Sequence, residues 1–78
     1  MPADPLLELF ARALDLPPDA VGEDLSYRGV PQWDSISHMA LVAALEDRYR
    51  ILLDTQDVLD LNSVARAREI LRRYGATP

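Results

Sequence analysis

Hydrophobic residues recur at helical spacing along three stretches of the chain, and each stretch begins with a polar residue suited to cap a helix. The first begins at Asp4, which precedes Pro5, a residue tolerated in the first helical turn. Pro17 and Pro18 cannot continue a helical hydrogen-bond ladder. A helix is therefore predicted from about Pro5 to Leu14. Its apolar face consists of Leu6, Leu7, Leu9, Phe10, Ala13 and Leu14.

The second stretch carries an apolar residue every four positions, the spacing of the inward face of an amphipathic helix. These residues are Leu41, Leu45 and Tyr49, with Val42 beside them. Asp34 lies where the pattern begins, and its carboxylate can accept hydrogen bonds from backbone N–H groups one turn further on. The sequence therefore predicts a helix from about Ser35 to Arg50 with Asp34 as its N-cap.

The last third of the chain contains a short helical pattern and a longer one. A short helix is predicted at about 55–60, capped by Asp54 or Thr55, with Val58, Leu59 and Leu61 facing inward. The longer helix begins after Ser63 and ends at Gly75, a residue that readily adopts the left-handed conformation found after helices. Its apolar face consists of Val64, Ala67, Ile70, Leu71 and Tyr74.

The connection between the first two helices has no sustained period of either kind. It runs from Pro17 to Trp33, about seventeen residues, which is long for a loop inside a small domain. Trp33 stands just before the second helix, where an apolar residue often packs against the helix it precedes. A packing role is predicted for Trp33, and a role as a binding aromatic is the alternative. The fold class is all-α, with three main helices, one short helix and this long loop.

Size and composition limit the function further. The chain has 78 residues, enough for a single domain over 1–78 but too few to line a deep substrate cleft as well as a core. The net charge of −5 repels nucleic-acid phosphates, so no nucleic-acid partner is expected. The absence of cysteine and of a long apolar run leads us to expect a soluble, monomeric, cytoplasmic protein without a membrane span.

One hydroxyl group stands out as a candidate functional group. Ser35 follows the predicted cap Asp34 and lies outside the apolar face, so its hydroxyl is expected at the exposed start of the second helix. A phosphate attached there would lie close to free backbone N–H groups and to the positive end of the helix dipole. From the aspartate and serine alone, the favoured interpretation is that Ser35 merely helps Asp34 to cap the helix, because capping serines are common.

The order of these elements resembles the acyl carrier proteins and the related carrier modules of polyketide and nonribosomal peptide assembly. The resemblance covers residues 4–74 and rests on Asp34-Ser35-Ile36 at the start of the second helix and on Asn62-Ser63-Val64 at the start of the last. It implies an acyl-carrier-like bundle in which Ser35 is the attachment residue for 4′-phosphopantetheine from coenzyme A. It further implies that the thiol of this arm carries an acyl group as a thioester. The implied partners are a phosphopantetheinyl transferase and the enzymes that load and process the acyl group, so the chain itself is not expected to be an enzyme.

The sequence departs from the carriers of fatty-acid synthesis, which usually have several acidic residues after the serine. Here no acid lies between Asp34 and Glu46, so apolar contact is expected to contribute more to partner binding than charge. The predicted docking residues are Ile36, Met39, Ala43 and Asp57. Trp33 before the motif and His38 after it are more similar to free-standing carriers of secondary metabolism, which indicates a dedicated biosynthetic pathway.

Three other functions are alternatives to an acyl carrier. An aminoacyl or peptidyl carrier shares the same chemistry and differs only in cargo, and a cofactor-free helical adaptor would use the apolar patch alone. A Ser35 and His38 nucleophile–base pair is conceivable because the two residues lie one helical turn apart. It lacks a third orienting group and a pocket, so His38 is expected to hydrogen-bond to the backbone of the long loop instead. No metal site is expected from a chain with one histidine and no cysteine.

Overall fold

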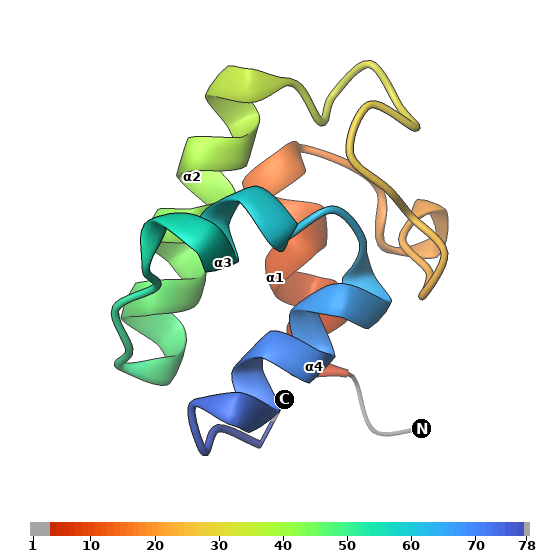
Figure 1. Cartoon of the computed structure of the whole chain (residues 1–78). Helices are drawn as coiled ribbons and strands as arrows, with labels where there is room; N and C mark the ends of the chain where they lie inside the picture. The colour runs from red at the N-terminus through yellow and green to blue at the C-terminus, as the bar shows by residue number, and fades with distance from the viewer. Residues whose placement is uncertain (1–3, 78) are drawn as a thin grey trace.

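Residues 4–77 are described by a computed structural model, and their helices lie close to the predicted positions (Figure 1). The elements are α1 (Pro5–Leu14), a 3₁₀ turn (Pro18–Ala20), α2 (Ser35–Tyr49), α3 (Thr55–Asp60) and α4 (Val64–Arg73). In Figure 1, α2 lies beside α1, and α3 and α4 follow one another in front of these two helices. The predicted all-α class is confirmed.

Each of the four α-helices begins after a residue whose side-chain oxygen accepts a hydrogen bond from a first-turn N–H. These N-cap residues are Asp4, Asp34, Asp54 and Ser63. The ends of α1 and α3 lie where the sequence predicts, and α4 ends at Arg73, two residues before Gly75. α2 stops one residue early, at Tyr49, because Arg50 adopts a left-handed backbone with φ of 55°. The Arg50 N–H donates to the carbonyl of Glu46 in that conformation, which closes the last turn.

A single core joins α1, α2, α4 and the end of the long loop. Its largest fully buried side chains are Trp33, Phe10, Leu6, Leu14, Leu41, Leu45, Leu61, Ile70, Leu71 and Val64. Trp33 is completely buried and meets the ring of Phe10 edge-on, with the ring centroids 5.5 Å apart. The predicted packing role of Trp33 is therefore confirmed. The inward prediction for Leu59 is wrong, because its side chain is 70% exposed.

The long loop is held by backbone hydrogen bonds to the start of α4. The Tyr27 N–H donates to the Asn62 carbonyl at 2.9 Å, and the Val64 N–H donates to the Leu25 carbonyl at 3.1 Å. Ser26 and Ser63 form an isolated antiparallel bridge at the same place. These bonds satisfy backbone groups that a loop of this length would otherwise expose, so the loop is part of the folded body.

Arg68 of α4 ties three segments together. Its guanidinium donates two hydrogen bonds of 2.7 Å to the carboxylate of Glu23 in the loop and one of 2.6 Å to Asp4 at the start of α1. The hydrogen bond from Arg68 is the main reason why the pKa of Glu23 lies below its ordinary value. Burial alone would raise the pKa of Asp4, but its bonds from Arg68 and the Leu6 N–H outweigh burial and lower it.

Acid is expected to weaken the fold through these carboxylates. A carboxyl with a depressed folded pKa stabilises the fold above its unfolded pKa, which is 3.8 for Asp4 and 4.5 for Glu23, and loses that contribution as the pH falls through the folded value. Urea unfolding at about pH 7 and about pH 3 measures the loss. Arg68→Met should be less stable at neutral pH and should lose less stability on acidification. An equal loss in both proteins would contradict this assignment.

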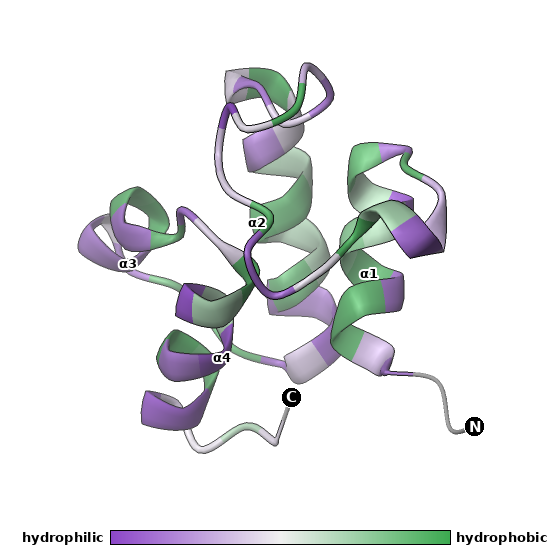
Figure 2. Ribbon diagram, turned by 90° about the vertical axis from the view of Figure 1, so that its right-hand side faces the viewer, coloured by the Kyte–Doolittle hydropathy of each residue, from purple (hydrophilic) through white to green (hydrophobic). Residues whose placement is uncertain are grey.

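Figure 2 shows a difference in polarity between two of the helices. Much of α2 is coloured as hydrophobic through its middle, whereas α4 carries broad hydrophilic segments. Only one side of α2 packs against the core, where Leu41, Val42 and Leu45 are buried. Part of the apolar surface of α2 is therefore left facing solvent.

Candidate functional site

Ser35 occupies the first position of α2 and is exposed. Asp34 caps the helix before it, and its carboxylate accepts a hydrogen bond of 2.9 Å from the Ser37 N–H. This bond is the main reason why the pKa of Asp34 lies below its ordinary value. Because Asp34 performs the capping, the hydroxyl of Ser35 is not needed for it and stands at the open end of the helix.

Apolar side chains are exposed along α2 next to Ser35. Ile36 is 82% exposed and Met39 is 57% exposed, and Ala40 and Ala43 are exposed beside them. The expectation that Ile36 faces solvent is confirmed. Exposed aliphatic groups gathered on one helix face are typical of a surface that contacts other proteins.

His38 is held by side-chain and backbone partners on both ring nitrogens. Its Nδ1 accepts a hydrogen bond of 3.0 Å from the indole Nε1–H of Trp33, so its Nε2 carries the proton and donates to the Val58 carbonyl at 2.9 Å. The predicted bond to the loop backbone is therefore wrong: the partners are a loop side chain and the backbone of α3. With both nitrogens engaged, His38 is not arranged to take a proton from Ser35.

Three rings pack together beneath the first turn of α2. The ring of Tyr27 meets Trp33 at 6.2 Å and His38 at 5.3 Å between centroids, in both cases edge-on. The rings of Trp33 and His38 are stacked, with an interplanar angle of 19°. These contacts connect the long loop, α2 and, through the Val58 bond, α3, so they fix the part of α2 that presents Ser35.

Asp57 does not belong to the exposed surface. Its side chain lies at the junction of α3 and α4, is only 7% exposed, and accepts hydrogen bonds from the Tyr74 hydroxyl and from Arg73. The bond from Tyr74 is the main cause that lowers the pKa of Asp57 and raises the pKa of Tyr74. The prediction of Asp57 as a docking residue is therefore corrected: its carboxylate is used to join two helices.

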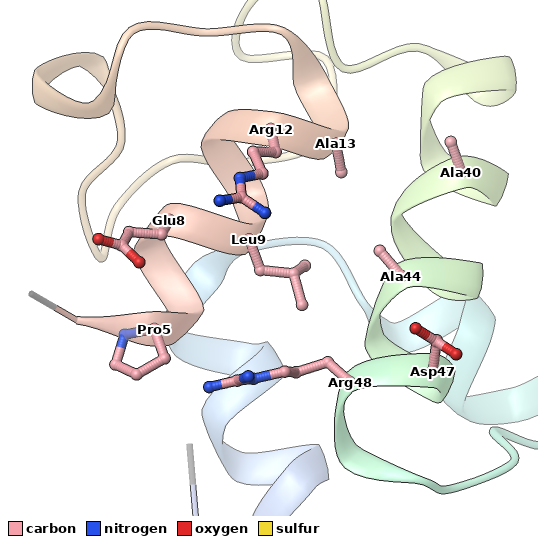
Figure 3. Close-up of a pocket in the computed structure, with 9 residues that line it drawn as sticks. All are labelled: Pro5, Glu8, Leu9, Arg12, Ala13, Ala40, Ala44, Asp47 and Arg48. Carbon is pink, nitrogen blue, oxygen red and sulfur yellow. The ribbon is translucent and has the colours of Figure 1, made fainter.

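A groove of about 440 Å³ runs between α1 and α2 (Figure 3). Leu9 points from α1 into the space between the helices, and Ala13, Ala40 and Ala44 leave the groove open because their side chains are small. The residues that line it include charged and apolar side chains but no serine, histidine or cysteine. The groove therefore offers no hydroxyl, imidazole or thiol group from its lining side chains.

Residues 4–77 also lack two other kinds of feature. Within this range no group of three or more histidine, cysteine, aspartate or glutamate side chains is placed to hold a metal ion. No helix in the same range combines the length and the apolar character that crossing a membrane requires. The exposed hydroxyl of Ser35 and the apolar face beside it therefore form the candidate functional site.

Comparison with known proteins identifies the family. The family model described as "Phosphopantetheine attachment site" matches residues 4–71, which includes all four α-helices except the last two residues of α4. No curated protein matches the chain. The matched range takes in the helical bundle and the segment around Ser35. The chain therefore belongs to the phosphopantetheine attachment family and is a carrier protein that bears covalent 4′-phosphopantetheine.

Proposed function

We propose that Ser35 is the residue that bears the 4′-phosphopantetheine, and that the chain carries acyl groups as thioesters between the enzymes of a dedicated biosynthetic pathway. The observation that carries this proposal is the exposed hydroxyl of Ser35 at the first position of α2, directly after a cap made by Asp34. We further propose that residues 1–78 act as one monomeric carrier domain in the cytoplasm, without catalytic activity and without nucleic-acid partners.

The surroundings of Ser35 suit a phosphodiester. The Asp34 carboxylate and carbonyl accept hydrogen bonds from the N–H groups of Ser37 and His38, so the N–H groups of Ser35 and Ile36 remain at the open end of the helix. A phosphate group there benefits from these donors and from the helix dipole. A separate transferase would join the Ser35 oxygen to the phosphopantetheinyl phosphorus of coenzyme A, with release of the hydroxyl proton and adenosine 3′,5′-bisphosphate.

The division of labour follows from the size of the chain. When bound, the arm supplies a thiol on which an acyl group is held as a thioester. The helices provide a fixed attachment point and a surface that partner enzymes recognise. A covalent tether keeps the cargo at high effective concentration near each partner that binds this surface. The catalytic groups belong to the partners, which agrees with the engagement of both His38 nitrogens within this chain.

The docking surface consists of Ile36, Met39 and Ala43, which lie along one exposed side of α2. Between Asp34 and Glu46 this helix has no acidic residue, so long-range attraction of basic partners is weak at this surface. Contact affinity must come mainly from burying these apolar side chains. Partners are expected to present apolar side chains opposite Ile36.

Ile36→Asp is expected to leave the helices intact and to slow modification by the transferase at least tenfold. The reason is that Ile36 is 82% exposed, so the change removes apolar contact area without opening a cavity. Leu52→Asp is a matched control, because Leu52 is 81% exposed and follows the other end of α2. Circular dichroism and the rate of mass gain with coenzyme A are measured for both. Equal rates in the two variants would remove Ile36 from the docking surface.

The exposed apolar face also favours a second candidate, a helical adaptor whose partner binds this face without using the arm. The carrier and the adaptor can be distinguished by comparing the phosphopantetheine-bearing protein with the Ser35→Ala variant. For each protein, the binding of partner proteins and the transfer of cargo to them are measured. A carrier transfers cargo to its partners only with the arm in place, whereas an adaptor binds equally well without it. An aminoacyl or peptidyl cargo is distinguished by loading assays with amino-acid-activating and acyl-activating ligases in parallel.

A further inference from the structure

We propose that Arg28 pairs with the phosphate esterified to Ser35 and thereby orients the start of the arm. This inference rests on the proposed function, because it requires the modification at Ser35. It assigns a ligand to a loop residue that neither the attachment motif nor the core explains.

The backbone brings Arg28 to the opening of α2. The Arg28 N–H donates to the Trp33 carbonyl at 3.1 Å, and the Trp33 N–H donates to the Val30 carbonyl at 3.2 Å, so the segment from Arg28 to Trp33 closes on itself. Arg28 holds a left-handed conformation with φ of 62°, which a non-glycine residue adopts at a cost. The closed turn therefore fixes Arg28 beside the residue that lies two positions before Ser35.

The side chain of Arg28 is directed by its neighbours. Its guanidinium carbon lies 5.5 Å from the centroid of the Tyr27 ring, and that ring contacts His38 at 5.3 Å. His38 lies one helical turn below Ser35 on α2. A hollow of about 280 Å³ next to the helix opening is lined by both Arg28 and Asp34. Arg28 thus borders the same space as Asp34, which caps the helix.

A cation near Ser35 would balance the negative charges at the start of α2. Residues 13–47 contain one arginine, Arg28, and no lysine. The carboxylate of Asp34 already lies at the opening of α2, and its pKa is lowered, so it keeps its negative charge at neutral pH. A phosphodiester on the adjacent Ser35 adds a second negative charge. Arg28 is the residue of this region that can offset both charges, and a guanidinium can donate two hydrogen bonds to a phosphate at once.

Arg50 provides a matched control for Arg28. It is also exposed, also has a left-handed backbone with φ of 55°, and stands at the opposite end of the same helix. Arg28→Gln and Arg50→Gln therefore remove the same charge from the same kind of backbone. The wild-type protein and both variants are modified with coenzyme A and a promiscuous phosphopantetheinyl transferase, and the mass gain is confirmed first.

Nuclear magnetic resonance then tests the pairing. We expect the Nε–Hε resonance of Arg28 to shift on modification while that of Arg50 does not. We also expect the phosphorus resonance of modified Arg28→Gln to differ from wild type, and that of modified Arg50→Gln to match it. If the protein gains mass at Ser35 but both arginines and both variants behave alike, Arg28 does not bind the phosphate and the carrier function stands. If no mass is gained, the proposed function fails and this inference fails with it.

Discussion

Trp33→Ala is expected to destabilise the fold by about 3–5 kcal/mol, the usual cost of removing a fully buried aromatic ring. The indole is completely buried, packs edge-on against Phe10, and donates its only N–H to Nδ1 of His38. A chain of this length is stable by about 4–12 kcal/mol in total, at about 0.05–0.15 kcal/mol per residue. The substitution therefore removes a large share of the free energy of unfolding.

A second substitution separates the packing of Trp33 from its hydrogen bond. Trp33→Phe keeps a ring against Phe10 but leaves Nδ1 of His38 without its donor, and should cost about 1–3 kcal/mol. Both variants are measured by urea unfolding followed by circular dichroism, because Trp33 is the one tryptophan of the chain and fluorescence is lost with it. If Trp33→Ala lowers the free energy of unfolding by less than about 1 kcal/mol, the indole of Trp33 is not a main stabilising part of the core.

The positions of the helices could be predicted from the sequence because their signals are local. A capping side chain bonds to an N–H two or three residues away, as Asp34 does to Ser37 and Ser63 does to Arg66. Apolar spacing then gave the buried face of each long helix. The exposed position of Ser35 was predicted in the same way, from its place directly after a cap, whereas its proposed role came from the resemblance of Asp34-Ser35-Ile36 to the carrier motif.

The contacts between distant segments could not be predicted, because spacing along the chain does not identify partners across the fold. Asp57 was predicted as a docking residue, yet Arg73 at the end of α4 and Tyr74 directly after it donate hydrogen bonds to its carboxylate. His38 was assigned to the loop backbone, but the indole of Trp33 and the carbonyl of Val58 occupy its nitrogens. Arg68 likewise reaches Asp4 from 64 residues away. These partners are set by how the helices pack.

The exposed Leu59 illustrates the limit of a short pattern. A helix of six residues offers too few positions to fix which side faces the core. Leu61, two residues later, is buried in the core, whereas the side chain of Leu59 is exposed to solvent. The longer α1 and α4 left no such ambiguity, because each repeats its apolar face over ten residues.

Ser35→Ala is expected to abolish modification completely while leaving the helices unchanged. The hydroxyl is the proposed acceptor, and no hydrogen bond of the cap depends on it because Asp34 performs that role. Ser37→Ala is the matched control, since it removes a neighbouring hydroxyl and retains that of Ser35. Circular dichroism should give the same helical content for both variants and for the wild type.

The mass of the intact protein after incubation with coenzyme A and a promiscuous phosphopantetheinyl transferase tests the central claim most directly. Wild type and Ser37→Ala should each gain one phosphopantetheinyl group, and Ser35→Ala should gain none. A wild-type protein that stays at its original mass, or a Ser35→Ala protein that still gains the group, would contradict Ser35 as the attachment site.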